Sequence, residues 1–192
     1  MAIRIEFMNP SQSHIFVDYI DHLKFGHAPE WSTCYCRYYH TKADQDEWMM
    51  RSGNLNRNEA IMSIKEGSMQ GFLAFDGDTC IGWLNANDAS AYIRIEEDIK
   101  PIVKDRKVAC TMCFIIHPEY RNKGIARQLL SSAVAHFREL GFDGMLGMPF
   151  VSNEFQKQYR GTLNMYKELG YKEIEVHENV HVMWINFKGG VE

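Results

Sequence analysis

The stretch of sequence that decides the fold is residues 108–140, VACTMCFIIHPEYRNKGIARQLLSSAVAHFREL. It opens with nine residues that are nearly all apolar, and the run ends at His117 and a proline, so we expect a buried strand there. From Ala126 to Leu140 the apolar residues recur at steps of three and one, which is the spacing of one helix face. Gly141 is the expected end of that helix. The stretch therefore predicts a core strand that leads into an amphipathic helix through a short polar turn.

The turn between this strand and this helix has the character of an anion site. The first N–H groups of a helix have no partner inside it, and the peptide dipoles add a partial positive charge at that end. Arg121, Lys123 and Arg127 gather around Gly124, whose lack of a side chain leaves room for a ligand. Cations at a helix start are unfavourable unless an anion offsets them, so we expect a phosphate or diphosphate there. The chain has neither GxxxxGK[ST] nor GxGxxG, so the usual ATP, GTP and dinucleotide sites are not expected.

Two short motifs carry a resemblance to a known family. Residues 121–126, RNKGIA, resemble the R/Q-x-x-G-x-G/A signature of the GNAT superfamily of acyl-CoA N-acyltransferases, and the preceding FIIHPEY resembles the strand end that leads into it. Residues 165–171, MYKELGY, resemble the Y-x-x-x-G-F ending of the family's last helix. The two matches occur in the family's order and on the expected elements. They cover the C-terminal part of the chain, and the N-terminal part has no comparable motif.

The resemblance implies a fold and a cosubstrate. The fold is an α/β (α+β) single domain over residues 1–192, with a mixed, mostly antiparallel sheet flanked by helices and with two central strands that splay apart. The cosubstrate is acetyl-CoA, with its pyrophosphate at the helix start and its pantetheine arm along the end of the central strand. The cofactor-binding residues implied are Phe114, Ile115, Ile116, Arg121, Asn122, Lys123, Gly124, Ile125, Ala126 and Arg127. Asn153 is either a further cofactor contact or a plain turn residue.

For catalysis the resemblance points to Tyr166. Acyl transfer from a thioester to an amine expels a thiolate, and a tyrosine hydroxyl near the sulfur can protonate it. The alternative is that Tyr166 is only a core residue of an amphipathic helix. Glu96, Glu97 and Asp98 are candidates for the base that deprotonates the amine, or they are simply a solvated acidic face.

The implied function is N-acetyl transfer by direct attack of an amine on acetyl-CoA. The alternative is a non-catalytic domain that binds or senses acyl-CoA. The acceptor is an amine of a small molecule or peptide that the sequence does not identify, and monomer and homodimer both stay open. The aromatic segment at residues 31–40 either encloses a cationic or aromatic amine, through Trp31, Tyr35, Tyr38 and Tyr39, or packs as an ordinary loop. Two cysteines and one histidine in that segment are too few ligands for a closed zinc site, so we expect no metal.

Composition and charge bound the class of protein. A chain of 192 residues with 45% hydrophobic content can bury one full core. The net charge of −4 does not indicate that the protein binds nucleic acid. The longest apolar run is too short to cross a membrane. Arg4 and Glu6 interrupt the N-terminal apolar residues, unlike a secretory leader. Five cysteines without a spacing pattern indicate reduced thiols in a cytoplasmic protein.

Outside the deciding stretch, periodicity and turn residues predict the remaining elements. Strands are expected at 3–7, 70–75, 79–84, 142–150, 171–177 and 180–187, and helices at 11–24, 43–51, 57–65 and 155–169. Asn56 is a possible cap of the third helix, and Gly161 weakens the last one. Residues 85–91 are expected to form a polar loop, and residues 92–103 fit no single element.

Overall fold

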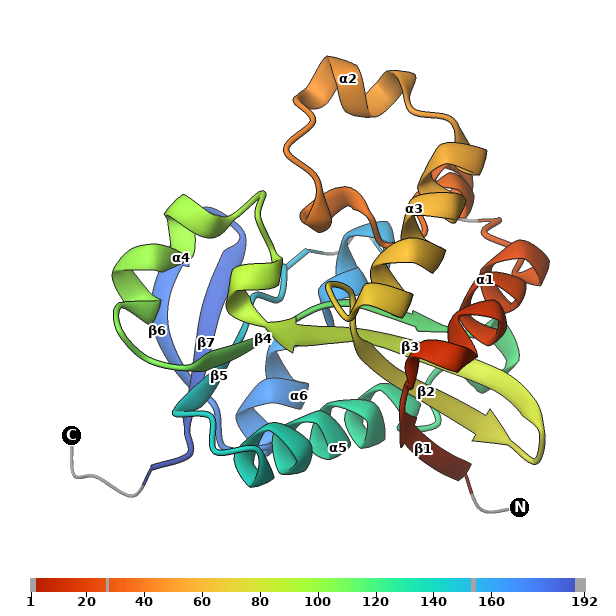
Figure 1. Cartoon of the computed structure of the whole chain (residues 1–192). Coiled ribbons are helices and arrows are strands. Elements are labelled where there is room, and N and C mark those ends of the chain that lie inside the picture. The colour runs from red at the N-terminus through yellow and green to blue at the C-terminus, as the bar shows by residue number, and fades with distance from the viewer. Residues whose placement is uncertain (1–2, 27, 153–154, 189–192) are drawn as a thin grey trace.

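The computed structural model describes residues 3–26, 28–152 and 155–188, and its central feature is one seven-stranded sheet (Figure 1). The strands are β1 (Ile3–Phe7), β2 (Gly71–Asp76), β3 (Thr79–Asp88), β4 (Val108–Ile116), β5 (Gly144–Gly147), β6 (Lys172–His177) and β7 (Val180–Asn186). Their order across the sheet is β1-β2-β3-β4-β5-β7-β6, and only the β4–β5 pair is parallel. The expected mixed, mostly antiparallel sheet is confirmed.

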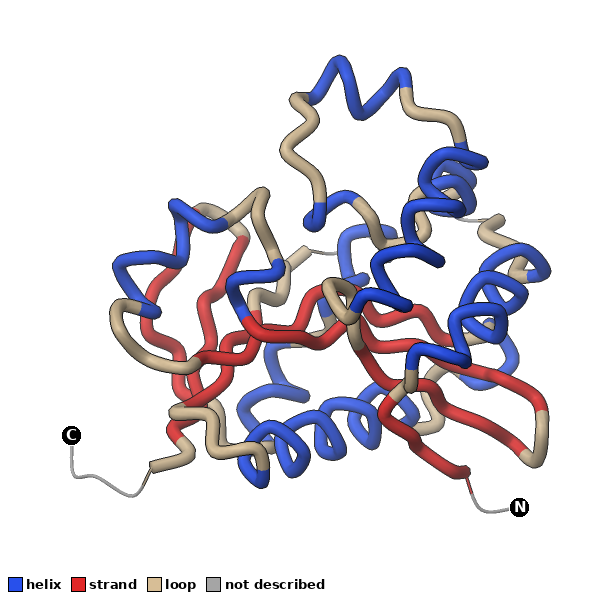
Figure 2. Tube along the Cα trace, viewed as in Figure 1, coloured by secondary structure: helices blue, strands red, loops and turns tan. Residues whose placement is uncertain are grey.

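Helices cover both faces of the sheet (Figures 1 and 2). They are α1 (Ser13–His22), α2 (Gln45–Met50), α3 (Gly53–Glu66), α4 (Glu96–Val103), α5 (Ile125–Glu139) and α6 (Leu163–Glu168). In the view of Figure 1, α1 and α3 lie above the central strands and α5 lies below them, while α2 stands away from the sheet. Short 3-10 turns connect them, among them η2 (Pro29–Thr33), η3 (Tyr38–His40), η4 (Ala89–Ala91) and η6 (Phe155–Arg160). Within the described ranges no helix is long and apolar enough to cross a membrane.

The core has two halves because side chains alternate across a strand. On one face, Leu73 and Trp83 pack with the residues of α1 and α3, and on the other face Phe72 and Leu84 pack with α5. Helix α5 has the periodicity predicted for it, because its buried residues are Ile125, Leu129, Leu130, Ala133, Val134 and Phe137. The strand–turn–helix unit predicted for residues 108–140 is therefore confirmed, and it stands at the centre of the molecule.

Strand β4 is bulged and then separates from its neighbour. Leu84 of β3 pairs with Phe114, but Ala86 pairs with Thr111, so two residues of β4 lie opposite one of β3. Pairing between β4 and β5 ends at Thr111 and Gly147, although β4 continues to Ile116. The splay between the central strands is present as expected. It leaves one edge of β4 without a strand partner over residues 112–116 of the described sheet.

Two expectations about the polar parts of the chain were wrong. Residues 85–88 are the end of β3, not a loop, and Asn85 is fully buried. Its side chain is satisfied there, because Nδ2 lies 3.0 Å from His40 Nε2 and Oδ1 accepts from the Tyr92 hydroxyl at 3.0 Å. Helix α3 starts earlier than expected, with Ser52 as its cap, and Asn56 instead donates to the Thr33 carbonyl at 2.9 Å.

Two further elements are shorter than their sequence patterns suggest. The expected helix at 155–169 is two pieces, η6 and α6, because Gly161 takes a left-handed φ of 81° and Thr162 caps a new helix. The strand expected at 142–150 is reduced to β5, with one isolated bridge from Phe150 to Val180. Residues 92–103, which fitted no single element, contain α4.

Candidate active site

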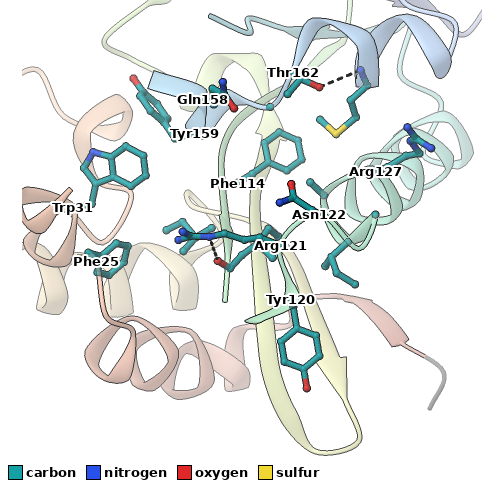
Figure 3. Close-up of a pocket in the computed structure, with 17 residues that line it drawn as sticks. Phe25, Trp31, Phe114, Tyr120, Arg121, Asn122, Arg127, Gln158, Tyr159 and Thr162 are labelled. Carbon is teal, nitrogen blue, oxygen red and sulfur yellow. Dashed lines mark hydrogen bonds between the residues drawn. The ribbon is translucent and has the colours of Figure 1, made fainter. Parts of the chain in front are cut away.

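A cavity of about 510 Å³ opens where β4, the start of α5 and η6 come together (Figure 3). Its lining comprises Phe25, Trp31, Phe114, Ile115, Ile116, Tyr120, Arg121, Asn122, Gly124, Ile125, Ala126, Arg127, Gln158, Tyr159, Gly161, Thr162 and Met165. All of the predicted cofactor-binding residues are therefore brought together here except Lys123, which does not line the cavity, and Asn153, which lies outside the described residues.

The start of α5 is open and positively polarised. Gly124 has a left-handed φ of 78°, and no described atom lies within 4 Å of the position that a Cβ would take there. Asn122 also has a positive φ, of 59°. The first hydrogen bond of the helix runs from the Gln128 N–H to the Gly124 carbonyl at 3.1 Å, and the first turn contains no acidic residue. The N–H groups before Gln128 thus lie at a helix start that no side chain caps.

The cations of the turn already have partners within the protein. The Arg121 Nε donates to the Ile116 carbonyl at 3.2 Å, which holds its side chain across the end of β4 (Figure 3). Arg127 forms an ion pair with Glu168, and both side chains are more than half exposed. Such an exposed pair contributes little stability, so a phosphate could replace the Glu168 carboxylate at small cost.

Tyr166 lies in the core next to the cavity but does not line it. The side chain is fully buried, and its hydroxyl donates to the Arg160 carbonyl at 2.9 Å and lies 3.0 Å from Thr111 Oγ1. The ring packs so closely on Gly147 that a Cβ there would lie 2.1 Å from it. Burial raises the pKa of Tyr166 well above its ordinary value. Its role as proton donor to the thiolate stays a prediction, and the hydroxyl proton is directed at a backbone carbonyl in this structure.

The opposite end of the cavity is built by residues that no motif had indicated. Tyr159 lines the cavity, and its hydroxyl lies 2.7 Å from that of Tyr39. Arg160, the next residue, donates to the Tyr39 hydroxyl. Burial raises the pKa of Tyr159, and the adjacent Arg160 guanidinium opposes that rise. Tyr159 and Arg160 lie in the stretch 155–169 that the sequence predicts to be helical, and no motif there marks them as functional.

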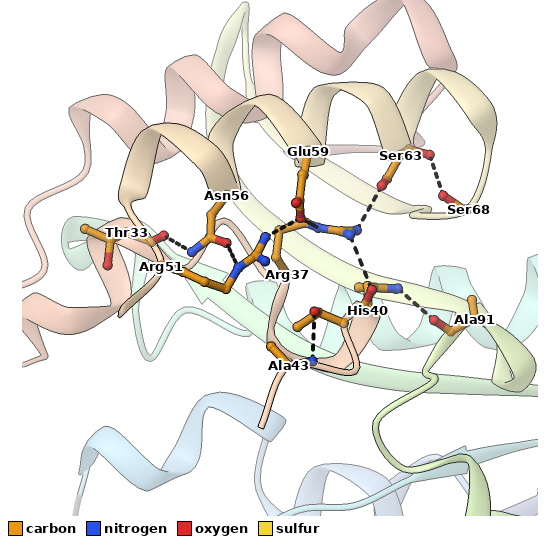
Figure 4. A network of polar contacts seen from close by, with 11 residues as sticks. Thr33, Arg37, His40, Ala43, Arg51, Asn56, Glu59, Ser63, Ser68 and Ala91 are labelled. Carbon is orange, nitrogen blue, oxygen red and sulfur yellow. Dashed lines mark hydrogen bonds and ion pairs between the residues drawn. The ribbon is translucent and has the colours of Figure 1, made fainter. Parts of the chain in front are cut away.

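The aromatic segment at residues 31–40 is held in place by a network of charges (Figure 4). Arg37 donates to Ser63 Oγ at 2.9 Å and lies 3.5 Å from Glu59, which also pairs with Arg51. The network ties the segment to α3. Of the four aromatic residues expected to enclose an amine, Trp31 alone lines the cavity.

The acidic candidates lie away from the cavity, and the thiol of the aromatic segment is unreactive. Glu96, Glu97 and Asp98 form the exposed first turn of α4 and do not line the cavity. Burial raises the pKa of Cys34 to about 12, so its thiol is protonated at neutral pH and is a poor nucleophile. Over the described ranges, no three histidine, cysteine or acidic side chains are grouped so as to hold a metal ion.

Comparison with known proteins gives a family and a fold. The family model described as "Acetyltransferase (GNAT) family" matches residues 28–171, which is well over half of the chain. A search of curated protein sequences finds no match. Among solved structures, the PaiA N-acetyltransferase of Thermoplasma acidophilum, in complex with coenzyme A, is 16% identical, with a TM-score of 0.56 and coverage of 97% of this chain and 99% of that one.

Two further structures share the fold over nearly their whole length. The yncA protein of Salmonella typhimurium, solved with its cofactor acetyl-CoA, is 12% identical, with a TM-score of 0.54 and coverage of 100% of this chain and 98% of that one. The polyamine N-acetyltransferase of Drosophila melanogaster, described as forming N-acetylagmatine, is 9% identical, with a TM-score of 0.57 and coverage of 96% and 100%. At such low identities the likeness establishes the fold alone.

Proposed function

Because the chain belongs to the GNAT acetyltransferase family, we propose that it transfers an acetyl group from acetyl-CoA to the amine of a small molecule or peptide. The observation that carries this proposal is the open helix start at Gly124, which continues into a cavity along the unpaired edge of β4. Two structures of the same fold were solved with coenzyme A or acetyl-CoA, which supports the same class of cosubstrate here.

The residues present fit an acyl-CoA. The free N–H groups at the start of α5 suit a diphosphate, and the space beside Gly124 is one that a side chain would have filled. Arg127 adds a charge that can exchange its carboxylate partner for a phosphate oxygen. The edge of β4 at residues 112–116 offers backbone groups to the amides of a pantetheine arm, in the way that a neighbouring strand would.

In the reaction, the chain itself would position the thioester and polarise its carbonyl group. An extended arm held along β4 would bring its thioester to the end of the cavity near Trp31 and Tyr159. Backbone N–H groups of the bulged strand would stabilise the charge that develops on the thioester oxygen. The amine must arrive neutral to attack, and water is the simplest acceptor of its proton, since Glu96, Glu97 and Asp98 do not line the cavity.

Two measurements on the full chain test this function. Calorimetry with coenzyme A measures binding, and a free-thiol assay with acetyl-CoA measures turnover against a panel of amino acids, polyamines, aromatic amines and peptides with free N-termini. We expect binding and an amine-dependent release of thiol. Binding without turnover over the whole panel would favour the alternative of an acyl-CoA-sensing domain, and a lack of coenzyme binding would overturn both functions.

A further inference from the structure

Three side chains at the end of the cavity remote from α5 form one hydrogen-bonded group, here called the phenol–guanidinium cluster: Tyr39, Tyr159 and Arg160. Tyr39 comes from η3 and the other two come from η6. The two hydroxyl oxygens lie 2.7 Å apart, and Arg160 donates to Tyr39 Oη through Nε, at 3.1 Å, and through Nη2. Tyr39 is 3% exposed and Arg160 is 9% exposed, so the cluster is shielded from bulk water on the Tyr39 side.

The directions of these hydrogen bonds follow from the chemistry of the groups. A guanidinium has only donors, so Tyr39 Oη accepts both bonds from Arg160 and has its two lone pairs engaged. The Tyr39 hydrogen must then go to Tyr159 Oη, the remaining neighbour. Tyr159 Oη accepts that bond, and its own O–H is left without an acceptor among the described residues. Tyr159 lines the cavity, so a ligand that reaches its hydroxyl could accept this proton.

The Arg160 guanidinium next to these hydroxyls favours a negatively charged ligand at Tyr159. Arg160 also donates to the Met148 carbonyl at 3.4 Å, and its guanidinium carbon lies 4.2 Å from the centre of the Phe150 ring. No carboxylate of the described chain lies within ion-pair range of it. A buried cation that no described carboxylate neutralises would stabilise a negative charge that develops nearby, because the protein interior screens it weakly.

In the proposed function, the arm along β4 would bring its thioester to this same end of the cavity. In Figure 3 the ring of Tyr159 stands beside Trp31, and its hydroxyl is directed away from Asn122 and Arg127, at the far end of the cavity from the helix start. The neighbouring Tyr166 has its proton directed at the Arg160 carbonyl. Tyr166 therefore holds the backbone of Arg160, and Gly161, at φ 81°, turns the chain immediately after it.

We propose that the Tyr159 hydroxyl is the proton donor to the coenzyme thiolate, and that Tyr39 and Arg160 are positioning residues that direct its O–H bond into the cavity. This inference rests on the proposed acyl transfer from acetyl-CoA. It assigns the acid chemistry to a residue outside the two sequence motifs.

The acyl transfer conserves atoms and charge without a further reactant. The amine nitrogen bonds to the thioester carbon, the carbon–sulfur bond breaks, and the sulfur keeps the electron pair. The Tyr159 proton passes to sulfur, the amine loses one proton to water, and water returns a proton to the Tyr159 phenolate. Arg160 stabilises that phenolate through Tyr39 while it lasts. The products are an amide and the free thiol of coenzyme A.

The test reads the ionisation of the bound thiol, so it needs no acceptor. Coenzyme A is bound to the full chain and titrated with base, and the ultraviolet absorbance of the thiolate is followed. The complex with desulfo-coenzyme A is the blank, which removes the absorbance of the protein's own tyrosines. The variants are Tyr159→Phe, Tyr39→Phe and, as a matched control from the same 3-10 turn, Tyr38→Phe, whose ring packs on Trp48 and Arg94.

A hydroxyl that donates to the thiolate lowers the pKa of the bound thiol. In Tyr159→Phe we expect the ionisation constant of that thiol to fall about tenfold relative to the wild type. Tyr39→Phe should give a smaller change of the same sign, because it frees the Tyr159 hydroxyl to turn away, and Tyr38→Phe should match the wild type. If Tyr159→Phe does not fold, Tyr39→Phe carries the same test.

Two outcomes would overturn the inference in distinguishable ways. Equal thiol ionisation in the wild type and in Tyr159→Phe, with coenzyme A bound to both, would remove Tyr159 as the donor and leave the proposed function intact. Failure of the wild-type chain to bind coenzyme A would overturn the proposed function, and the inference with it.

Discussion

The two ends of the cavity are built in opposite ways. At the α5 end the chemistry belongs to the backbone, and it comes from neighbouring residues between Phe114 and Arg127. At the other end it belongs to side chains, and Tyr39 reaches a partner 120 residues away in sequence. An anion of any identity can use the first end, because N–H groups and a dipole recognise charge. The second end depends on three particular groups in one arrangement. In the proposed function, the first end would determine binding and the second would determine chemistry.

The largest effect is expected from a substitution that disrupts only the α5 end of the cavity. Gly124→Glu adds a negative charge and a side chain at a left-handed position in front of the helix start, and we expect coenzyme A affinity to fall by about 1,000-fold, or about 4 kcal/mol. Gly141→Glu is the matched control, because Gly141 has a similar φ of 73° and equally open surroundings just beyond the opposite end of α5. Calorimetry measures both, and an unchanged dissociation constant in Gly124→Glu would refute the anion site.

The next largest effect is expected for the salt-bridge network that ties the aromatic segment, residues 31–40, to α3. Glu59→Gln leaves Arg37 and Arg51 without their shared countercharge, and their side chains are only 10% and 15% exposed. We expect a loss of about 3 kcal/mol in unfolding free energy, measured by urea denaturation. The exposed pair of Glu97 and Lys100 gives the control, since Glu97→Gln should change stability by less than about 1 kcal/mol. An equal, small change in both variants would show that the network does not hold the aromatic segment.

The unfolding free energy should also depend on pH, through His40 of the same aromatic segment. Burial lowers the pKa of His40 from its ordinary 6.5 to about 4, so the unfolded chain binds the extra proton between these values. Stability from this group is complete above pH 6.5 and is lost as the pH falls toward 4, a loss of about 3 kcal/mol. His40→Gln should show a shallower fall in unfolding free energy across this window. An equal slope in His40→Gln and in the wild type would show that this buried imidazole does not cause the fall.

The smallest expected effect separates the two tyrosines. Tyr166→Phe removes a hydrogen bond to the Arg160 carbonyl, and we expect a loss of about 1–2 kcal/mol in stability, an unchanged coenzyme A affinity and little change in the pKa of the bound thiol. The role implied for Tyr166 by sequence resemblance predicts instead a fall in turnover far larger than any change in stability. Thiol ionisation, denaturation and turnover measured on this one variant distinguish the two roles.

Sequence reasoning succeeded where the structure is local. The β4–turn–α5 unit is continuous in sequence, so periodicity, a glycine and a cluster of cations sufficed to predict both its fold and its polarity. It failed where contacts between residues far apart in the sequence determine the local structure. Asn85 looks like a loop residue until His40 and Tyr92 satisfy its amide inside the sheet. Tyr159 lies in a stretch that reads as plain helix, and only the fold brings Tyr39 to its hydroxyl. Residues far apart in the chain leave no mark of their pairing in a single sequence.

The unpaired edge of β4 has a consequence for the lifetime of the protein. No neighbouring strand pairs with this edge over residues 112–116 of the described sheet, although the Ile115 carbonyl accepts from the Tyr19 hydroxyl and the Ile116 carbonyl accepts from Arg121. In the proposed function, a coenzyme along this edge would take the place of a missing strand, and it could do so only in the folded chain. Mass action then raises the melting temperature with coenzyme concentration. Starvation for the cosubstrate would leave the protein easier to unfold and to degrade, so its abundance would follow the metabolic supply of its own reactant.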